Sequence, residues 1–232
     1  MHESSVKSRS IRSFVIRAGR MTTAQRRALT DYWPRYGIDY QSTPLDLDQL
    51  FGRIAPRSVE VGFGNGEHLL ERALAQPERD FLGLEVHPPG VGHLLLATAE
   101  AGASNVRIIA HDAVEVLQSQ IPLQSLDEVQ LLFPDPWPKK RHHKRRLVQP
   151  EFVALVAARL RAGGRFHLAT DWEPYAEEML TVLGACDLLA NCSVEGGYTE
   201  AVVARSATRF ERRGARLGHR VRELLFWRRL TA

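Results

Sequence analysis

A glycine-rich turn follows the first strong strand signal and could hold a ligand. The residues RSVEVGF predict a strand, and Gly62, Gly64 and Gly66 are spaced as G-x-G-x-G at its end. Glycine lets the backbone turn tightly and approach a ligand closely. The third glycine comes one residue earlier than in the G-x-G-x-x-G turn of dinucleotide sites, and Glu60 and Glu67 flank the turn. Two carboxylates would repel a pyrophosphate but would attract a ligand with an amino or sulfonium cation.

Two further acids follow the next two predicted strands. Glu85 comes roughly 20 residues after the glycines, where an acid binds ribose hydroxyls in nucleotide-binding folds. Asp112 could accept a hydrogen bond from an adenine amino group. The set therefore predicts a cationic adenosine ligand without phosphates, namely S-adenosylmethionine. In the alternative interpretation, Glu85 and Asp112 only cap the helices that follow them.

The stretch LLFPDPWPKKRHHKRR could form a reaction centre. Asp135 lies between Pro134 and Pro136, whose rings fix φ and make the turn rigid. Trp137 could stack on a nucleobase or pack in the core. Residues 139–146 follow as a predicted loop with six Lys and Arg, two His and no acid. An acid that could meet a methyl acceptor is thus joined to a segment that could bind phosphates.

Charge is distributed unevenly along the chain. The formal net charge is +4, yet residues 1–30, 139–146 and 205–229 hold 22 of the 31 Lys and Arg and only three of the 27 acids. Three solvated basic faces would be the simpler explanation. The absence of acids from residues 139–146 argues against it, because like charges this close repel unless a polyanion neutralises them. No strongly apolar face accompanies the charges, so we expect nucleic acid rather than a membrane surface as the partner.

Composition excludes several classes of protein. The 232 residues are 44% hydrophobic and 25% charged, which is typical of a globular protein. No apolar run approaches the ~18–20 residues of a membrane span, and no secretory signal is visible. Cys186 and Cys192 are the only cysteines, which favours a reducing cytoplasm. His142 and His143 have no matching acid or cysteine cluster, so we expect no metal. No unpartnered apolar helix stands out, so we expect a monomer.

Strands and helices are predicted to alternate through the central part of the chain. The expected strands cover residues 57–63, 80–87, 106–113, 127–133 and 165–172. The expected helices cover residues 23–33, capped by Thr22 or Thr23, and then 66–75, 91–102, 113–120, 151–164 and 173–185. This alternation predicts a doubly wound, mostly parallel α/β sheet. Residues 208–229 predict two antiparallel strands around a glycine turn. We expect a basic extension over residues 1–50 and one domain over residues 51–232.

The motifs also resemble a known family. GFGNG, LEVH, HDA, PDPWPKKRHHKRR, ATDWE and TRFERRG are similar to the motif series of the bacterial tRNA (guanine-N7-)-methyltransferase family. The stretches RSFVIRAGRMTTAQRRAL and YWPRYGI resemble that family's amino-terminal segment, so the resemblance covers nearly the whole chain. It implies a Rossmann-like methyltransferase fold. It also implies that S-adenosylmethionine methylates N7 of the guanine at position 46, in the variable loop of tRNA.

The resemblance further implies the roles of individual residues. The cofactor would be bound by Glu60, Gly62, Gly64, Gly66, Glu85, Asp112 and Asp135. Asp135 would also be catalytic. The substrate would be bound by Lys139, Asp171, Thr208, Arg209, Phe210 and Glu211, and the RNA-contact region would comprise Arg141, His142, His143, Lys144, Arg145 and Arg146. In the alternative interpretation, Asp171 caps the helix that begins at residue 173 or 174.

The implied reaction suits this residue set. Guanine N7 carries a lone pair and no proton, so it can attack a sulfonium methyl group without a general base. The protein must then position two partners and stabilise a purine that becomes cationic, and carboxylates can do both. Three alternatives stay open. PDPW loosely resembles the (D/N)PP(Y/F/W) turn of amino-group methyltransferases, the chain could be an RNA-binding module with a vestigial pocket, and an NAD-dependent oxidoreductase is disfavoured by the glycine spacing.

Overall fold

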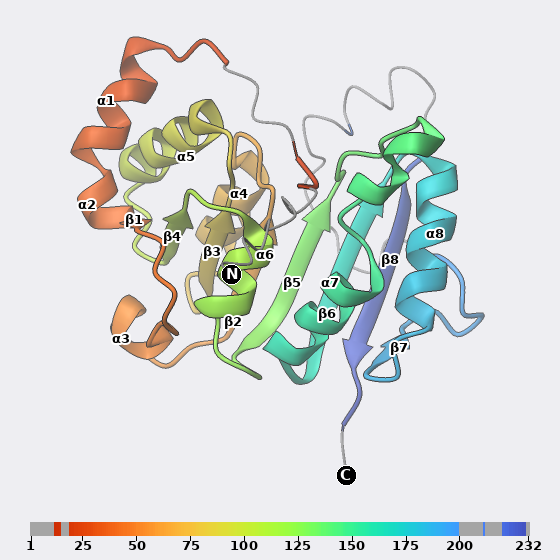
Figure 1. Ribbon diagram of the computed structural model, residues 1–232. Coiled ribbons are helices and arrows are strands. Elements are labelled where there is room, and N and C mark those ends of the chain that lie inside the picture. Colours follow the sequence, from red (N-terminus) through yellow and green to blue (C-terminus); the bar gives the residue numbers. More distant parts are fainter. Residues whose placement is uncertain (1–11, 15–18, 200–210, 212–219, 231–232) are drawn as a thin grey trace, which may run out of the picture.

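A computed structural model describes residues 12–14, 19–199, 211 and 220–230. The described residues form one sheet of eight strands in the order β1-β4-β3-β2-β5-β6-β8-β7 (Figure 1). The strands are β1 (Gly37–Ile38), β2 (Arg57–Val61), β3 (Asp80–Leu84), β4 (Val106–Ile109), β5 (Leu126–Leu132), β6 (Leu160–Thr170), β7 (Leu189–Asn191) and β8 (Arg222–Arg228).

The sheet is parallel from β1 to β6 and antiparallel beyond β6. The strand order reverses between β2 and β5, because β3 and β4 extend the sheet on one side and β6 extends it on the other. In open α/β sheets, ligands bind outside the carboxyl ends of the strands at such a reversal. The prediction of a doubly wound, mostly parallel sheet with an antiparallel carboxyl-terminal edge is confirmed.

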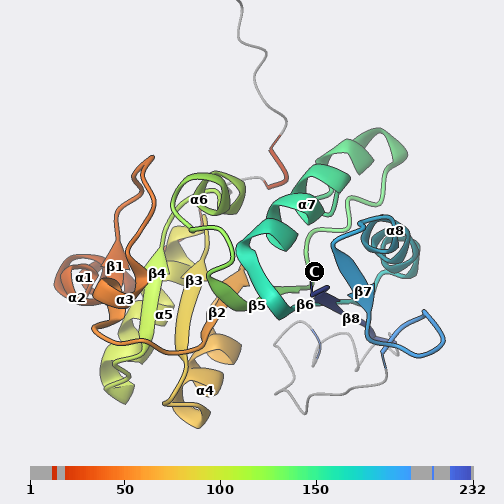
Figure 2. The ribbon, with the colours of Figure 1, turned by 90° about the horizontal axis from the view of Figure 1, so that it is seen from below.

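Helices cover both faces of the sheet (Figure 2). They are α1 (Thr23–Asp31), α2 (Trp33–Tyr36), α3 (Leu47–Phe51), α4 (Glu67–Ala75), α5 (Pro88–Ala101), α6 (Ala113–Ser119), the 3₁₀ helix η1 (Lys140–Arg145), α7 (Pro150–Arg159) and α8 (Glu173–Gly184). On one face, Val116 of α6, Val153 of α7 and Met179 of α8 are buried in one apolar core. On the other face, Leu69 of α4 and Leu94 of α5 are buried in a second core. Two apolar cores therefore sandwich the strands, which explains why a central strand such as β3 is buried along its whole length.

The amino-terminal part of the chain joins the main sheet. Thr22 caps α1 in a capping box, because its hydroxyl accepts from the Gln25 amide and the Gln25 side chain accepts from the Thr22 amide. Tyr36 is fully buried, and β1 pairs in parallel with β4. The sequence did not predict β1, since two residues are too short to show a strand period.

The tail differs from its prediction. β8 lies between β6 and β7, so the edge strand is β7, which the sequence did not predict. β8 therefore pairs with β6 and β7, and neither of these strands lies within residues 208–229, where the sequence predicted both members of the pair. Glu211, in the first half of the predicted strand pair, is helical, and the other residues of that half lie outside the described residues.

The boundary between α7 and β6 also differs from its prediction. The expected helix was to end on Gly163 and Gly164, but α7 ends at Arg159 and β6 begins at Leu160. The β5–β6 register shifts between Leu126 and Glu128. Gly163 there has φ +75°, and a Cβ on Gly164 would come within 3.0 Å of the Leu126 carbonyl oxygen. The glycines therefore serve an irregular strand rather than a helix end.

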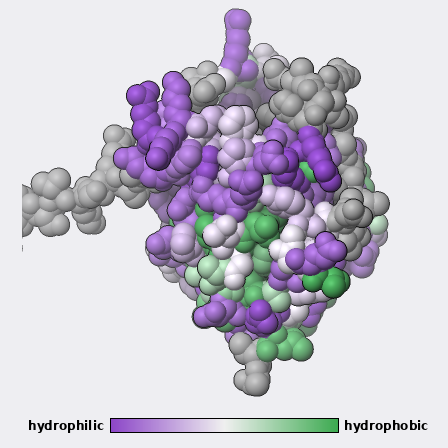
Figure 3. All heavy atoms as spheres, turned by 90° about the vertical axis from the view of Figure 1, so that its right-hand side faces the viewer, coloured by the Kyte–Doolittle hydropathy of each residue, from purple (hydrophilic) through white to green (hydrophobic). Residues whose placement is uncertain are grey.

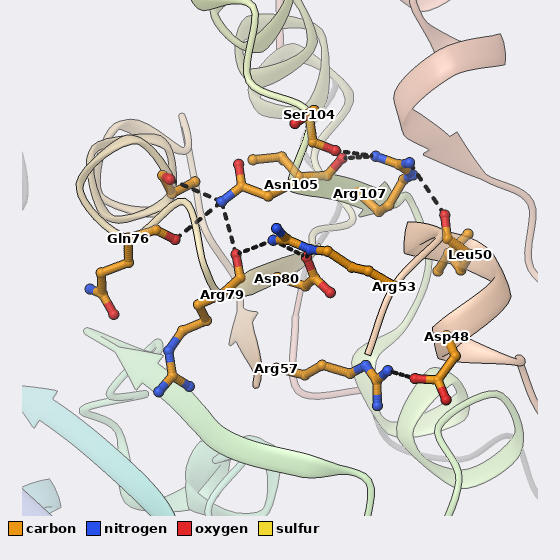
Figure 4. A network of polar contacts seen from close by, with 12 residues as sticks. Asp48, Leu50, Arg53, Arg57, Gln76, Arg79, Asp80, Ser104, Asn105 and Arg107 are labelled. Atoms are coloured by element: carbon orange, nitrogen blue, oxygen red, sulfur yellow. Dashed lines mark hydrogen bonds and ion pairs between the residues drawn. The ribbon is translucent and has the colours of Figure 1, made fainter. Parts of the chain in front are cut away.

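A polar network joins the amino ends of β2, β3 and β4 (Figure 4). The Asn105 amide donates to the carbonyl oxygens of Ala73, Gln76 and Arg79 at 2.9, 3.3 and 2.8 Å. Arg53 donates to the buried carboxylate of Asp80. This network holds the end of the sheet that faces away from the carboxyl ends of the parallel strands.

Candidate active site

A cavity of about 680 Å³ opens at the carboxyl ends of β2, β3, β4 and β5. It lies at the strand-order reversal between β2 and β5, the position that the fold predicts for a ligand. Of the predicted site residues, it is lined by Gly62, Gly64, Glu85, Asp112 and Asp135. These residues are spread over 74 positions of the sequence, and the parallel strands bring them to one edge.

The glycine turn makes an open cradle at the cavity. Gly62 and Gly64 have φ of +69° and +60°, and no atom lies within 4 Å of the place that a Cβ would take on either residue. Gly66 has a different function, because a Cβ there would come within 2.7 Å of the Leu94 side chain. Gly90 packs α5 against the turn, since its Cβ would lie 2.0 Å from the Gly64 carbonyl oxygen.

Glu85 is held by backbone donors. One carboxylate oxygen accepts from the Gly64 amide at 2.9 Å, and the other accepts from the Val86 and His87 amides at 2.7 and 3.0 Å. The carboxylate is therefore fixed against the glycine turn and directed at the cavity. This arrangement suits recognition of a pair of ribose hydroxyls.

Asp112 both caps a helix and lines the cavity. Its side chain accepts from the Val114 amide at 2.9 Å at the start of α6. Burial raises the pKa of Asp112 above its usual value, and the Glu115 carboxylate adds to this effect, although the Val114 hydrogen bond acts in the opposite direction. The alternative interpretation is therefore right that Asp112 caps a helix, but it is wrong for Glu85, because the N-cap of α5 is His87 and no side chain caps that helix. The Asp112 carboxylate stands partly desolvated beside the cavity.

The turn that contains Asp135 is strained. Phe133 and Trp137 have φ of +53° and +43°, a region that bulky L-residues rarely adopt. The Phe133 amide donates to the Ala169 carbonyl oxygen at 2.7 Å, and the Trp137 indole N–H donates to the Ser13 carbonyl oxygen at 3.1 Å. Asp135 is exposed between these two anchored residues. Strain of this kind is typical of functional sites.

The basic segment forms the short 3₁₀ helix η1, whereas the sequence predicted a loop. A 3₁₀ helix has three residues per turn, so its side chains fall into three rows. Arg141 and Lys144 are exposed. His142 and Arg145 pack on Trp137, with ring centroids 5.8 Å apart and a guanidinium-to-ring distance of 5.1 Å, respectively. His143 is half-buried, and Arg146, the residue that caps the carboxyl end of η1, is buried, whereas Lys140 at the start of the same row is exposed.

Arg146 is only 3% exposed. Its Nε donates to the Pro136 carbonyl oxygen at 2.9 Å, and its Nη1 donates to Glu178 on α8. Its Nη2 lies 3.1 Å from His143 Nε2, and the guanidinium stacks 4.8 Å from the centre of the Tyr175 ring. Arg146 therefore holds the turn that contains Asp135 and does not lie on the surface of the basic segment.

The cations of this segment also affect its histidine. Desolvation, followed by the charges of Arg141, Arg145, Lys139 and Lys144, lowers the pKa of His142. The neutral form of His142 is therefore favoured over the charged form. On the face that Figure 3 shows, the residues toward the end of the molecule where the parallel strands finish are mostly hydrophilic.

Several predicted residues lie apart from the cavity. Glu60 is 6% exposed within β2, opposite Gln130 of β5, and neither Glu60 nor Gly66 lines the cavity. Asp171 follows β6 and is also absent from the cavity wall. It does not cap α8, whose N-cap is Trp172. Thr208, Arg209 and Phe210 lie outside the described residues.

Sequence reasoning missed three residues of the cavity wall, namely Ser13, Phe14 and Leu147. Ser13 meets Trp137 across 124 positions of the sequence, and no local pattern reports such a contact. Within the described ranges, no group of three or more His, Cys, Asp or Glu side chains could hold a metal ion. No helix in the same ranges is long and apolar enough to cross a membrane.

Comparison with known proteins identifies the family. A family described as putative methyltransferase matches residues 55–224. A tRNA (guanine-N(7)-)-methyltransferase of Sodalis glossinidius is 54% identical over 218 residues, which cover 94% of this chain and 91% of the relative. The enzyme of the same name from Leifsonia xyli is 55% identical, with coverage of 92% and 93%. The chain therefore belongs to the tRNA (guanine-N(7)-)-methyltransferase family. The resemblance seen in the sequence motifs is thus confirmed.

Solved structures agree on the fold of the family. The 16S rRNA methyltransferase KamB superposes with a TM-score of 0.58 at 20% identity, covering 80% of this chain and 93% of its own. A 16S rRNA (adenine(1408)-N(1))-methyltransferase from Catenulisporales acidiphilia gives a TM-score of 0.54 at 15% identity. At these identities the likeness shows only that the family shares its architecture with other methyltransferases.

Proposed function

We propose that this protein transfers a methyl group from S-adenosylmethionine to N7 of a guanine in tRNA, the reaction named for its relatives. The target is the guanine at position 46 in the variable loop. One observation carries this proposal: the wall of the cavity that contains Gly64, Glu85, Asp112 and Asp135 extends to Pro138, and the cationic helix η1 begins two residues later at Lys140. A site for the methyl donor and a surface for a polyanion thus meet at Asp135.

The cavity fits the cofactor. The open cradle at Gly62 and Gly64 admits a ligand against the backbone, the anchored Glu85 would bind the ribose hydroxyls, and Asp112 would accept from the adenine amino group. Bound S-adenosylmethionine supplies an electrophilic methyl group on a sulfonium cation. The acidic wall suits that positive charge, whereas it would repel the pyrophosphate of a dinucleotide.

Asp135 would act on the guanine. N7 attacks through its own lone pair, so the protein provides position and charge rather than a base. The carboxylate on the rigid turn would accept from the guanine N–H groups or stabilise the positive charge that appears on the ring. Because Phe133, Trp137 and Arg146 anchor the turn, the carboxylate needs little reorganisation during the reaction.

The RNA would lie along the outer rows of η1. The exposed Lys139, Arg141 and Lys144 suit contacts with phosphates, which position RNA without reading its sequence. His142 and Arg145 would hold Trp137 where it can meet a base. We assign His143 and Arg146 to positioning of the turn. Asp171 and the stretch of Thr208, Arg209, Phe210 and Glu211 remain proposed substrate contacts, and Glu60 a proposed cofactor residue.

The remaining expectations concern the whole chain. We propose that it works as a monomer in the cytoplasm, where its tRNA substrate is found. We also propose that residues 1–50 extend a methyltransferase domain over residues 51–232, although β1 and Tyr36 tie the two parts closely together. Sedimentation with and without tRNA would report the number of protein copies in the active complex.

The decisive experiment measures the product. The protein is incubated with labelled S-adenosylmethionine and total tRNA, and the nucleosides are identified by mass spectrometry. N7-methylguanosine at position 46 is expected, whereas a methylated exocyclic amine would favour an amino-group methyltransferase.

Asp135→Ala should lower the rate of methyl transfer about a hundredfold or more. Its melting temperature should not change, because Asp135 is exposed. The exposed Asp187→Ala serves as the control, and an active Asp135→Ala variant would remove Asp135 from the mechanism.

A further inference from the structure

A second cavity of about 650 Å³ adjoins the first, between α6, η1 and the beginning of α7. The two cavities share Ser13, Asp112 and Leu147 as walls. A polymer that places one unit in the first cavity can therefore place the next unit in the second. None of the cofactor contacts described above requires this second space.

One wall of the second cavity is cationic. Lys144 is exposed and Arg145 half-buried, both at the end of η1, and the exposed Arg12 lies in the same wall. Lys144 lines this cavity and also lies on the row of η1 that faces solvent. The carboxylates of Asp112, Glu115 and Glu151 line the same cavity, and Glu115 is paired with His111. The positive charge is therefore concentrated at the η1 side of the cavity, which is where a phosphate would lie.

Two helices supply an apolar floor with a polar rim. Val114 from α6 and Phe152 and Leu155 from α7 line the floor. Glu115 and Gln118 line the cavity beside Val114 on α6. A flat apolar surface with hydrogen-bonding groups at its margin fits a nucleobase, which has two apolar faces and a polar edge.

We propose that this cavity is the subsite for one nucleotide next to the methylated guanine in the RNA chain. Its phosphate lies against Lys144 and Arg145, and its base lies on the floor between α6 and α7. This inference rests on the proposed function, because the first cavity must hold the target guanine. The subsite also gives a reason for local opening of the RNA, since two adjacent bases leave their stacks together and each gains a protein surface in exchange.

The first test fills the floor. Leu155→Trp places a large ring in the space of the base, so the KM for tRNA should rise about tenfold, the value of one base contact. The KM for S-adenosylmethionine should stay unchanged. Leu123→Trp, at a residue that is 66% exposed and lines neither cavity, is the matched control. Gln118→Glu, at an exposed rim position, repels the phosphate chain without filling the core and tests the subsite if Leu155→Trp does not fold.

The second test locates the nucleotide directly. A tRNA with 4-thiouridine in place of the nucleotide on either side of the target guanine is bound and irradiated, and the cross-linked peptide is sequenced. Cross-links within residues 113–118 or 149–155 support the subsite, whereas cross-links confined to other segments overturn it. An unchanged KM for tRNA in folded Leu155→Trp and Gln118→Glu variants also overturns it. A wild-type protein that forms no N7-methylguanosine would instead refute the proposed function.

Discussion

Arg145 and Arg146 are neighbours in the chain but lie on different sides of η1. The guanidinium of Arg145 stacks on Trp137, whereas that of Arg146 is buried against Pro136, Glu178 and Tyr175. A run of basic residues predicts a surface for a polyanion, but it does not tell which member turns inward. That distinction depends on the three-residue period of η1 and on Glu178, which is 32 positions away.

The inward position of Arg146 predicts a specific kinetic effect. Arg146→Lys keeps the charge but cannot donate to both Pro136 and Glu178 in the same geometry, so the turn with Asp135 should shift. We expect kcat to fall about tenfold or more. The Kd for tRNA should change less than twofold. Arg161→Lys, at an exposed residue near the amino end of β6, should leave both values unchanged. A weaker Kd with an unchanged kcat would instead make Arg146 an RNA contact.

Asp112 illustrates a conflict between stability and binding. Burial raises its pKa in the folded protein, so its ionised form destabilises the fold at neutral pH. Asp112→Asn should therefore raise the melting temperature at pH 7 while weakening the binding of S-adenosylmethionine, since asparagine still caps α6. The stabilisation should shrink as the pH falls through the folded pKa of Asp112 and vanish below its unfolded value near 4. Thermal scans between pH 4 and 8 would measure it, and a stability gain independent of pH would contradict it.

At the scale of elements, the amino ends of the strands contribute stability and the carboxyl ends contribute chemistry. Asn105 is buried, and its three hydrogen bonds join β4 to α4 and to the segment before β3. Sequence reasoning did not single it out, because a lone asparagine between a helix and a strand resembles any turn residue. Its importance arises from three carbonyl groups that come from 26 to 32 positions away.

Loss of these hydrogen bonds should destabilise the protein without affecting the site. Asn105→Ala removes the two N–H donors that three carbonyl oxygens share, so the free energy of unfolding should fall by about 2–3 kcal/mol. Asn105→Asp should cost more, because a carboxylate would face those carbonyl oxygens. Urea unfolding would measure both changes, and the KM for S-adenosylmethionine should remain unchanged. A stability near that of the wild type in both variants would show that water replaces the network.

Long periodic elements could be predicted from the sequence, and short or irregular ones could not. The alternation of apolar strands and amphipathic helices predicted β2 to β6 and the helices between them. β1 and β7 contain two and three residues, too few to show a period. The Gly163-Gly164 pair predicts a helix end from the sequence alone, because its function in the β5–β6 irregularity depends on a partner strand.

At the scale of the whole molecule, the cations of η1 lie at the same end as the cavity. This placement predicts a salt effect. The affinity of the protein for tRNA should fall less steeply with salt when Lys139, Arg141 and Lys144 are replaced with glutamine. The slope of log K against log salt concentration should become shallower by about two, because three phosphate contacts are lost. Arg161→Gln, near the opposite end of β6, is the control and should not change the slope. An unchanged slope in the triple variant would mean that the RNA approaches by another path.

The three-row arrangement of η1 also constrains how the segment can evolve. Inserting one residue between Lys140 and Arg145 would rotate every later side chain by a third of a turn. Arg146 would then swing out toward solvent, and a neighbour would have to enter the space between Glu178 and Tyr175. An insertion of three residues would restore the phase. Relatives should therefore exchange lysine and arginine at the exposed positions 141 and 144 but keep arginine at position 146, whereas the length of the segment should change only in steps of one full turn.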